Sequence, residues 1–237
     1  MEISAIIVAA GTGSRMKSNI RKQYLLLFGI PILIRTVQAI AYHPEIRNSI
    51  LVVPPGDSEY AEMLLRDYPE IKSVSAIVEG GITRSESVHH GFSSLKKNPP
   101  DLVVIHDGVR PLVEPALISS CIDAAKKYGA AIAAIPSKDT IKRVDQNGFI
   151  VETPERSRLW LAETPQVFRY ELLKNALTHC DTLISATDDA MLVEQHGIPV
   201  KIVEGSENNI KITRAIDIQL AELIWKEKEN DTSRYWI

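Results

Sequence analysis

Short runs of apolar residues recur along the 237-residue chain, and two of them, 102–105 and 130–135, contain no polar residue at all. A strand with one face in water alternates apolar and polar side chains, whereas an uninterrupted apolar run is typical of a strand buried on both faces. The runs lie at residues 3–8, 49–53, 74–78, 102–105, 130–135 and 200–203. We therefore predict a sheet that other elements cover on both sides, which restricts the chain to a small set of layered folds.

The segments between these runs carry signals for helix starts and ends. Pro31 suits the first turn of a helix, Thr83 and Glu86 form a capping-box pattern, and Gly129 follows an amphipathic stretch. The predicted helices begin at Pro31 and span 83–97, 115–128, 169–180, 187–196 and 213–227. Strands separated by helices predict a three-layer α/β fold with a Rossmann-like, mostly parallel sheet, formed by residues 1–237 as a single domain.

One segment, 139–168, departs from this alternation. Its Asn147-Gly148 dipeptide lies between two β-rich runs, which is the strongest short signal for a β-hairpin. Its apolar residues include Ile141, Val144, Phe149, Ile150 and Val151. The segment is either an additional edge hairpin on the main sheet or an inserted arm that protrudes from it, and we favour the arm because a second copy would cover its apolar side chains. We therefore predict a homodimer formed through this arm.

The composition is that of an ordinary globular protein, with 45% apolar residues, 24% charged residues and a net charge of −3. This balance argues against binding to nucleic acid. The two cysteines, Cys121 and Cys180, follow no metal-binding spacing, and the N-terminal apolar run lacks the basic residues and cleavage site of a signal peptide. We expect a soluble protein of the reducing cytoplasm that has no membrane segment.

The charges are unevenly distributed along the chain. Residues 3–44 contain five lysines or arginines and no Asp or Glu, whereas the rest of the chain is acidic. An acid-free basic segment in an acidic protein indicates a surface that faces an anion. Solvated surface cations would give the same composition, so this observation alone leaves both interpretations open.

Two glycines follow the first predicted strand, in the sequence Ala9-Ala10-Gly11-Thr12-Gly13-Ser14-Arg15-Met16. Open α/β sheets bind ligands at the carboxyl ends of their strands, and glycines let backbone N–H groups approach phosphates there. Met16 stands where a dinucleotide-binding G-x-G-x-x-G motif needs glycine, and the Gly-Lys-Ser/Thr of a P-loop is missing. Arg15 and Lys22 add cations suited to phosphate oxygens, so we predict a nucleoside triphosphate site in preference to a simple tight turn.

Two further charged residues follow predicted strands. Asp107 comes just after the run 102–105, which puts a hard carboxylate of the kind that Mg²⁺ prefers at the same edge of the sheet. Lys211 lies between the run 200–203 and the helix start at Thr213. The alternatives are a turn-capping role for Asp107 and a solvated position for Lys211. We expect both residues at the triphosphate site.

Several spaced motifs resemble those of one enzyme family. The loop at 9–16 and the sequence Lys22-Gln23-Tyr24-Leu25 are similar to the signature of the sugar-phosphate nucleotidyltransferases. The further motifs are His106-Asp107-Gly108-Val109-Arg110-Pro111, Lys138-Asp139-Thr140-Ile141-Lys142-Arg143, Thr164-Pro165-Gln166, Thr187-Asp188-Asp189, Val203-Glu204-Gly205 and Asn209-Ile210-Lys211-Ile212-Thr213. In this order, from residue 3 to about residue 224, they resemble the 2-C-methyl-D-erythritol 4-phosphate cytidylyltransferase family of the non-mevalonate isoprenoid pathway.

The resemblance implies a Mg²⁺-dependent cytidylyltransferase whose substrates are CTP and a sugar-alcohol phosphate. Arg15 and Lys22 match the residues that stabilise the transition state in this family. Arg156 and Lys211 match those that position the acceptor phosphate, and the resemblance places Arg156 in the neighbouring subunit's pocket. The matches to substrate-contacting residues are Arg110, Thr140 and Thr187, and the matches around the cytidine are Ala9, Ala10, Gly11, Gly81 and Ser87.

The chain departs from the family pattern at two positions. Ile82 stands where many relatives carry an Asp near the nucleotide, so a side-chain contact is lost there. Asn208 stands where some relatives carry an Asp assigned to the metal, which leaves Asp107 as the carboxylate predicted for Mg²⁺.

Two other functions are compatible with the same motifs. A ribitol-5-phosphate cytidylyltransferase shares the loop and the overall pattern. A non-catalytic nucleotide-binding module would keep the fold, but the joint presence of Arg15, Lys22, Asp107 and Lys211 argues against it.

Overall fold

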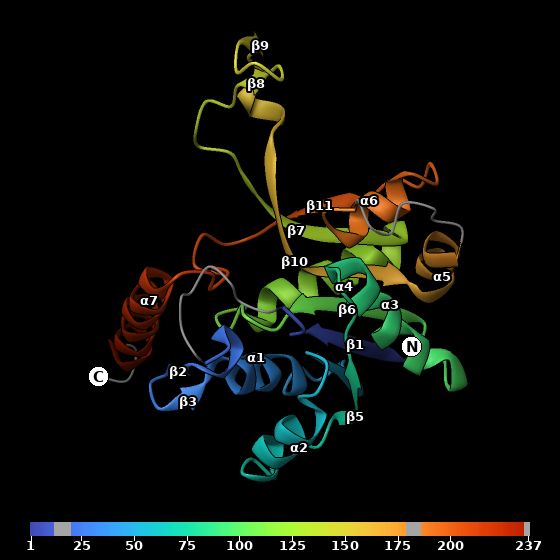
Figure 1. Cartoon of the computed structure of the whole chain (residues 1–237), viewed down its shortest axis with the longest axis vertical. Helices are drawn as coiled ribbons and strands as arrows, with labels where there is room; N and C mark the ends of the chain where they lie inside the picture. The colour runs from blue at the N-terminus through green and yellow to red at the C-terminus, as the bar shows by residue number, and fades with distance from the viewer. Residues whose placement is uncertain (12–19, 179–185, 235–237) are drawn as a thin grey trace.

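The computed structural model describes residues 1–11, 20–178 and 186–234. Its central sheet has seven strands, β1 Ile3–Val8, β4 Asn48–Val53, β5 Val74–Glu79, β6 Leu102–Asp107, β7 Ala130–Pro136, β10 Trp160–Arg169 and β11 Lys201–Glu204. In space they follow the order β11-β7-β10-β6-β1-β4-β5 (Figure 1). All six strands predicted from the apolar runs are confirmed.

The helices are α1 Ile32–Ala41, α2 Ser58–Arg66, α3 Arg84–Ser94, α4 Pro115–Tyr128, α5 Tyr170–Thr178, α6 Asp189–Glu194 and α7 Ala215–Arg234. The capping box of α3 is confirmed, because the Thr83 hydroxyl accepts from the Glu86 N–H and the Glu86 carboxylate accepts from the Thr83 N–H. Gly129 ends α4 with a φ of 92°. The prediction did not include α2. Within the described ranges, no helix combines the length and apolar character that crossing a bilayer requires.

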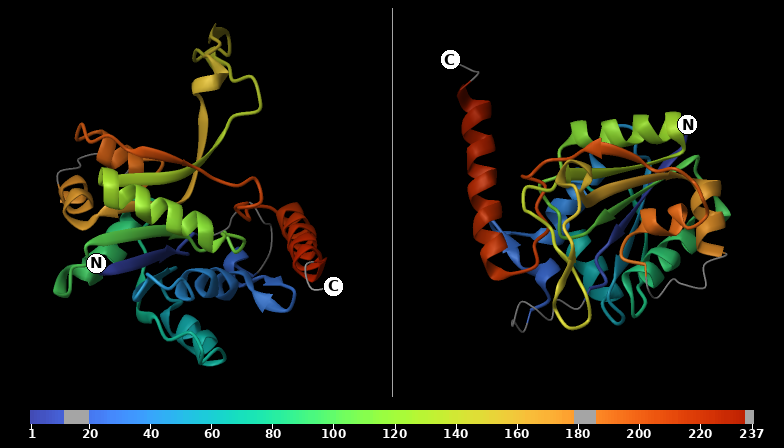
Figure 2. Two further views of the ribbon diagram at one scale, coloured as in Figure 1. Left: turned by 180° about the vertical axis from the view of Figure 1, so that it is seen from behind. Right: turned by 90° about the horizontal axis from the view of Figure 1, so that it is seen from above.

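The packing of β1 shows why its sheet is buried on both faces. Ile3 and Ile7 belong to one apolar cluster with residues of α1 and α4. Ile6, which points to the opposite face, belongs to a second cluster with residues of α3, α5 and α6. Figure 2 shows helices on both sides of the sheet. The predicted three-layer α/β fold with a mostly parallel sheet is therefore confirmed.

Strand β10 is the part of the sheet that the sequence did not predict. It runs antiparallel to its two neighbours, β6 and β7, and its residues Val167 and Phe168 are fully buried. These residues were expected within the arm at 139–168, so the C-terminal part of that segment lies in the main sheet instead. The Thr164-Pro165 pair obscured the strand, since Pro lacks the N–H that a ladder needs; the structure accommodates it at a register shift between Ala162 and Gln166.

The predicted hairpin is confirmed, although its strands are short. β8 Arg143–Val144 pairs antiparallel with β9 Ile150–Glu152 in a two-stranded sheet separate from the main one. At its turn, Asp145 Oδ1 accepts hydrogen bonds from the N–H groups of Asn147 and Phe149, and Gly148 adopts a φ of 85°. The hairpin projects away from the body as an arm (Figures 1 and 2).

A second small hairpin, which precedes α1 in the chain, packs against the last helix, α7. Its strands are β2 Leu26–Leu27 and β3 Ile30–Pro31, so Pro31 ends a strand and directly precedes α1. Leu27 packs in a third apolar cluster with Ile212, Ala221 and Ile224. This cluster fixes α7, and the loop that carries Lys211, against the body.

Gly91 shows how closely α3 lies on the sheet. A Cβ atom at this position would lie 2.6 Å from Ile6 Cγ2 and 2.8 Å from Val52 Cγ2, and both neighbours are buried in central strands. We expect Gly91→Ala to lower the free energy of unfolding by about 1–2 kcal/mol, because overpacking outweighs the better helix propensity of Ala. Urea unfolding measures this change. Ser94→Ala, at an exposed position of the same helix, should change stability by less than about 0.5 kcal/mol. An unchanged or higher stability of Gly91→Ala would mean that α3 can move off the sheet without cost.

Candidate active site

A cavity of about 540 Å³ opens at the carboxyl ends of β1 and β6. Its size is typical of sites for small molecules. Eight residues singled out from the sequence line it, namely Ala9, Ala10, Gly11, Lys22, Gly81, Ser87, Asp107 and Lys211. The structure therefore gathers residues from five separate parts of the chain at the edge of the sheet where ligands of open α/β folds bind.

The loop before α3 forms one wall of this cavity. Ser87 Oγ accepts a hydrogen bond from the Gly81 N–H at 3.1 Å and donates one to the Thr83 carbonyl at 2.9 Å. A side chain at Gly80 would collide with Ala10 Cβ and would lie 2.6 Å from Ser87 Oγ. The glycine is thus required for the close approach of this loop to the end of β1.

Ile82 lies on the same loop, at the rim of the cavity. Its side chain is 99% exposed, while its backbone N–H donates to Glu86 Oε2 at 2.7 Å. The backbone of the loop is therefore held in place although its side chain makes no buried contact.

Lys22 reaches the cavity from the short 3₁₀ helix Lys22–Tyr24. The next residue, Gln23, is fully buried and donates from Nε2 to the Ala9 carbonyl at 2.9 Å. The Tyr24 hydroxyl donates to Asp57 Oδ2 at 2.8 Å. These two hydrogen bonds anchor the 3₁₀ helix to the end of β1 and to the start of α2, so the position of Lys22 is set by its neighbours. Arg15, predicted beside it, lies outside the described residues.

Asp107 is the electrostatic centre of the site. Arg84 Nε lies 3.1 Å from its Oδ1, and Lys211 Nζ lies 2.8 Å from its Oδ2. Arg110 Nε lies 3.5 Å from the same Oδ2. Burial by itself raises the pKa of Asp107, but the three cations outweigh burial and hold that pKa far below its ordinary range. The carboxylate of Asp107 is therefore ionised at physiological pH.

Arg110 lies behind Asp107 and outside the lining of the cavity. Its Nη1 donates to the Asn209 carbonyl at 2.6 Å and lies 3.7 Å from Glu163 Oε1. Asn209 Nδ2 donates in turn to Glu163 Oε2 at 3.2 Å and to the Thr164 carbonyl at 2.8 Å. This buried network connects the loop of Lys211 to β10. The sequence analysis gave no role to Glu163 or Asn209, because only tertiary packing brings them to Arg110.

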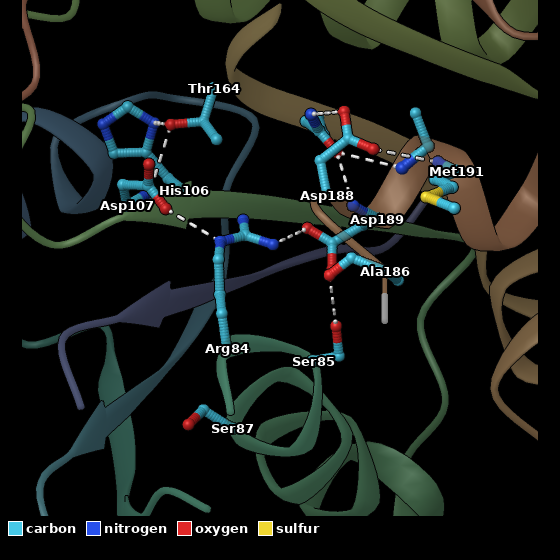
Figure 3. A network of polar contacts seen from close by, with 12 residues as sticks. Arg84, Ser85, Ser87, His106, Asp107, Thr164, Ala186, Asp188, Asp189 and Met191 are labelled. Atoms are coloured by element: carbon cyan, nitrogen blue, oxygen red, sulfur yellow. Dashed lines mark hydrogen bonds and ion pairs between the residues drawn. The ribbon is translucent and has the colours of Figure 1, made fainter. Parts of the chain in front are cut away.

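Arg84 is a second residue that the sequence analysis missed. It lines the cavity, and its guanidinium links Asp107 to Asp189, whose Oδ2 accepts from Arg84 Nη1 at 2.7 Å (Figure 3). The available sequence signals were its place after the Thr83 cap and the presence of Asp189 in the Thr187-Asp188-Asp189 motif. Neither signal reveals that the two residues meet.

Besides Arg110, three further predicted substrate residues do not line the cavity. Thr187 precedes α6, and its hydroxyl points to Met191 Sδ at 3.9 Å. Thr140 is exposed in the chain that leads to the arm. Arg156 lies on the arm in the 3₁₀ helix Arg156–Arg158, where its Nη1 donates to the Lys138 carbonyl at 2.9 Å. Within a single chain, the two arm residues are thus separate from the cavity-lining set.

His106 supports Asp107 from the protein interior. Its Nε2 lies 3.1 Å from the Arg110 carbonyl, which can only accept, so Nε2 carries the proton. Its Nδ1 then accepts from the Thr164 hydroxyl at 3.0 Å, and that hydroxyl oxygen accepts from the Asp107 N–H at 3.1 Å. Burial lowers the pKa of His106 to about 4, so the imidazole is neutral at physiological pH.

This lowered pKa predicts a loss of stability in acid. Between pH 6.5 and 4 the unfolded chain binds a proton at His106 that the folded chain does not, so stability falls as the pH falls through that window. We expect the free energy of unfolding to drop by about 2 kcal/mol from this residue between pH 7.5 and 5. Urea unfolding of the wild type and of His106→Asn, compared at both pH values, isolates its contribution. His90→Asn removes an exposed histidine on α3 as a control. Equal pH dependence in all three proteins would contradict a neutral buried His106.

Comparison with known proteins gives consistent matches over nearly the whole chain. Residues 3–227 match the model of the family IspD, 2-C-methyl-D-erythritol 4-phosphate cytidylyltransferase. The protein of that name from Desulforamulus reducens is 45% identical over 229 residues, which cover 95% of this chain and 97% of the relative. The one from Pelotomaculum thermopropionicum is 42% identical and covers 96% of each chain. The crystal structure of 4-diphosphocytidyl-2C-methyl-D-erythritol synthase from Anaerococcus prevotii superimposes with a TM-score of 0.80 at 34% identity, over 95% of this chain and 96% of the other.

Proposed function

The chain belongs to the IspD family of 2-C-methyl-D-erythritol 4-phosphate cytidylyltransferases, and we propose that the cavity at the ends of β1 and β6 is where it carries out the reaction of that family. The enzyme converts CTP and 2-C-methyl-D-erythritol 4-phosphate to 4-diphosphocytidyl-2-C-methyl-D-erythritol and pyrophosphate, a step of isoprenoid biosynthesis. The family match favours neither the ribitol phosphate alternative nor a non-catalytic module. The observation that carries the proposal is the convergence of eight predicted residues on one cavity.

The reaction requires the protein to position the substrates and to stabilise negative charge, and it needs no covalent intermediate with the protein. A phosphate oxygen of the methylerythritol phosphate attacks the α-phosphorus of CTP, the bond to the β-phosphate oxygen breaks, and pyrophosphate leaves. We propose that Lys22 and Arg15 stabilise the negative charge that shifts onto the oxygen bridging the α- and β-phosphorus atoms. Lys22 is supported by its place in the cavity lining, and Arg15 by its sequence position alone.

The cytidine and the acceptor phosphate take different sides of the cavity in this proposal. Ala9, Ala10, Gly11, Gly81 and Ser87 form the nucleotide side, where the narrow loop supplies backbone groups to the base. Lys211, at Asp107, forms the acceptor side of the lining. Arg110 lies behind Asp107 and Thr187 precedes α6, so we propose that these two residues contribute to acceptor binding from outside the lining. The side chain of Lys211 is 37% exposed, so its ammonium group can serve both Asp107 and an incoming phosphate.

Asp107 fits a Mg²⁺ ion that is held mainly by phosphate oxygens. Such ions take one or two protein carboxylates, and among the described residues no group of three or more His, Cys, Asp or Glu side chains gathers around a point. Asp107 supplies one charged carboxylate at the cavity, while Asn208 has no charge to add. We propose Asp107 as the protein ligand of Mg²⁺, which when bound neutralises negative charge on the phosphates.

We also propose that the enzyme is a homodimer that uses the arm as its interface. The arm exposes Phe149 at 72%, Ile150 at 62% and Val144 at 52% of their surfaces. Exposed apolar side chains on a two-stranded hairpin favour a partner that covers them. Thr140 and Arg156 would then serve the partner's site. A cytoplasmic location is proposed with it, since the chain has only two cysteines, too few for the disulfide framework of a secreted protein, and Cys121 is buried.

A turnover assay tests the function directly. With CTP, methylerythritol phosphate and Mg²⁺, we expect stoichiometric pyrophosphate release and a diphosphate product visible by ³¹P NMR. Replacing CTP by UTP should lower kcat/KM about 100-fold or more, because backbone groups paired with the exocyclic amine lose their partner. Ribitol 5-phosphate serves as the competing acceptor. Absence of pyrophosphate release with methylerythritol phosphate, or faster release with ribitol phosphate, would contradict the proposal.

A further inference from the structure

Arg84 connects three elements around the cavity. It is the first residue of α3, its Nε donates to Asp107 Oδ1 at the end of β6, and its Nη1 donates to Asp189 Oδ2 at the start of α6 (Figure 3). The distances are 3.1 and 2.7 Å. The planar guanidinium spans the two carboxylates in a way that a lysine ammonium cannot. The side chain of Arg84 thus joins the start of α3, the end of β6 and the start of α6.

The pairing of Arg84 with Asp189 explains why Arg84 stays in contact with Asp107. The Asp189 side chain is completely buried, and burial raises its pKa although Arg84 opposes that change. The pairing of the two side chains rests on geometry, since Asp189 Oδ2 lies 2.7 Å from Arg84 Nη1 and holds the guanidinium beside Asp107. The other charged groups that influence this pair are Asp107 and Asp188. With Arg84 held by Asp189, one oxygen of Asp107 is fixed and its second oxygen is left to Lys211 and Arg110.

We propose that Arg84 is a positioning residue for the cytidylyl transfer, which acts by holding the carboxylate of Asp107 in place, and that Asp189 is its buried counter-ion. The proposal rests on the proposed assignment of the cavity as the active site. Arg84 also lines the cavity, so the alternative to be separated is direct contact with a substrate.

A double-mutant cycle separates these roles. Arg84→Lys keeps the charge but loses one of the two contacts, and we expect kcat to fall about 10- to 100-fold while KM for each substrate stays within about threefold. In an Asp107→Asn background the same change should cost less than about threefold, because Arg84 acts through Asp107. Arg66→Lys, an exposed arginine on α2, is the matched control and should leave kcat unchanged.

Folding is monitored by the urea midpoint of each variant. If Arg84→Lys is unstable, Arg84→Met combined with Asp189→Asn removes both charges together, which avoids an unpaired buried carboxylate. This double variant should fold and show the same loss of kcat. Equal losses in the wild-type and Asp107→Asn backgrounds, a loss confined to KM, or a kcat within twofold of wild type would overturn the proposal. If the wild-type chain itself shows no turnover, the proposed site fails before any variant is compared.

Discussion

Lys22→Ala is expected to lower kcat about 10²- to 10³-fold and to change KM for CTP far less. The reason is that negative charge on the oxygen bridging the α- and β-phosphorus atoms grows as its bond to the α-phosphorus breaks. A cation fixed in the cavity therefore stabilises the transition state more strongly than the ground state. Gln23 and Tyr24 anchor the 3₁₀ helix independently of the Lys22 side chain, so truncation should leave the site otherwise intact. Steady-state rates of pyrophosphate release measure both constants.

Lys97→Ala is the control for this prediction. Lys97 is exposed at the end of the 3₁₀ helix Leu95–Lys97 and does not line the cavity. Its removal should leave both constants unchanged. A Lys22→Ala enzyme with normal kcat would remove Lys22 from the mechanism, and one with an unchanged kcat but a raised KM would make it a residue for substrate binding alone.

The second large effect is recovery of activity when two inactive variants are mixed. Lys22→Ala removes a cavity residue and Arg156→Ala removes an arm residue. If arms cross between subunits, random exchange makes half of the dimers mixed. Each mixed dimer then has one site with both residues intact, so activity should return to roughly a quarter of wild type. The assay follows pyrophosphate release after subunit exchange, which native mass spectrometry verifies.

A mixture of Lys22→Ala with Lys211→Ala is the control for complementation. Both residues line the same cavity of one chain, so no mixed dimer contains an intact site and activity should stay at background. Background activity of the Lys22→Ala and Arg156→Ala mixture, despite verified exchange, would show that each site uses the arm of its own chain. A monomer in solution would contradict the dimer itself.

The parallel strands were predictable because an apolar run indicates a buried strand whatever its neighbours are. The carboxyl ends of parallel strands then lie at the same edge of the sheet. That rule predicted one site for Lys22, Asp107 and Lys211, and all three residues line a single cavity. Strand β10 escaped prediction because its direction depends on the neighbours that it lies between, and because Pro165 interrupts its pattern.

The missing site residues have a similar explanation. Arg84 and Asp189 are 105 positions apart, and no local pattern indicates that they form an ion pair. Glu163 belongs to a strand that was not predicted, and Asn209 owes its role to two side-chain contacts with that strand. Hydrogen-bond networks of this kind follow from tertiary packing, whereas strand ends follow from the sequence itself.

The place of β10 also affects how the chain is made on the ribosome. Strands β1, β4, β5 and β6 are complete by Asp107 and are neighbours in the sheet, so they can assemble as the chain emerges. Strand β7 follows after α4 but has no place in the sheet beside β6 until β10 has been synthesised. For the few seconds that the segment from Pro136 to Arg169 requires, the edges of β6 and β7 that later pair with β10 stay unpaired. The nascent protein is therefore most exposed to aggregation while the arm is being translated.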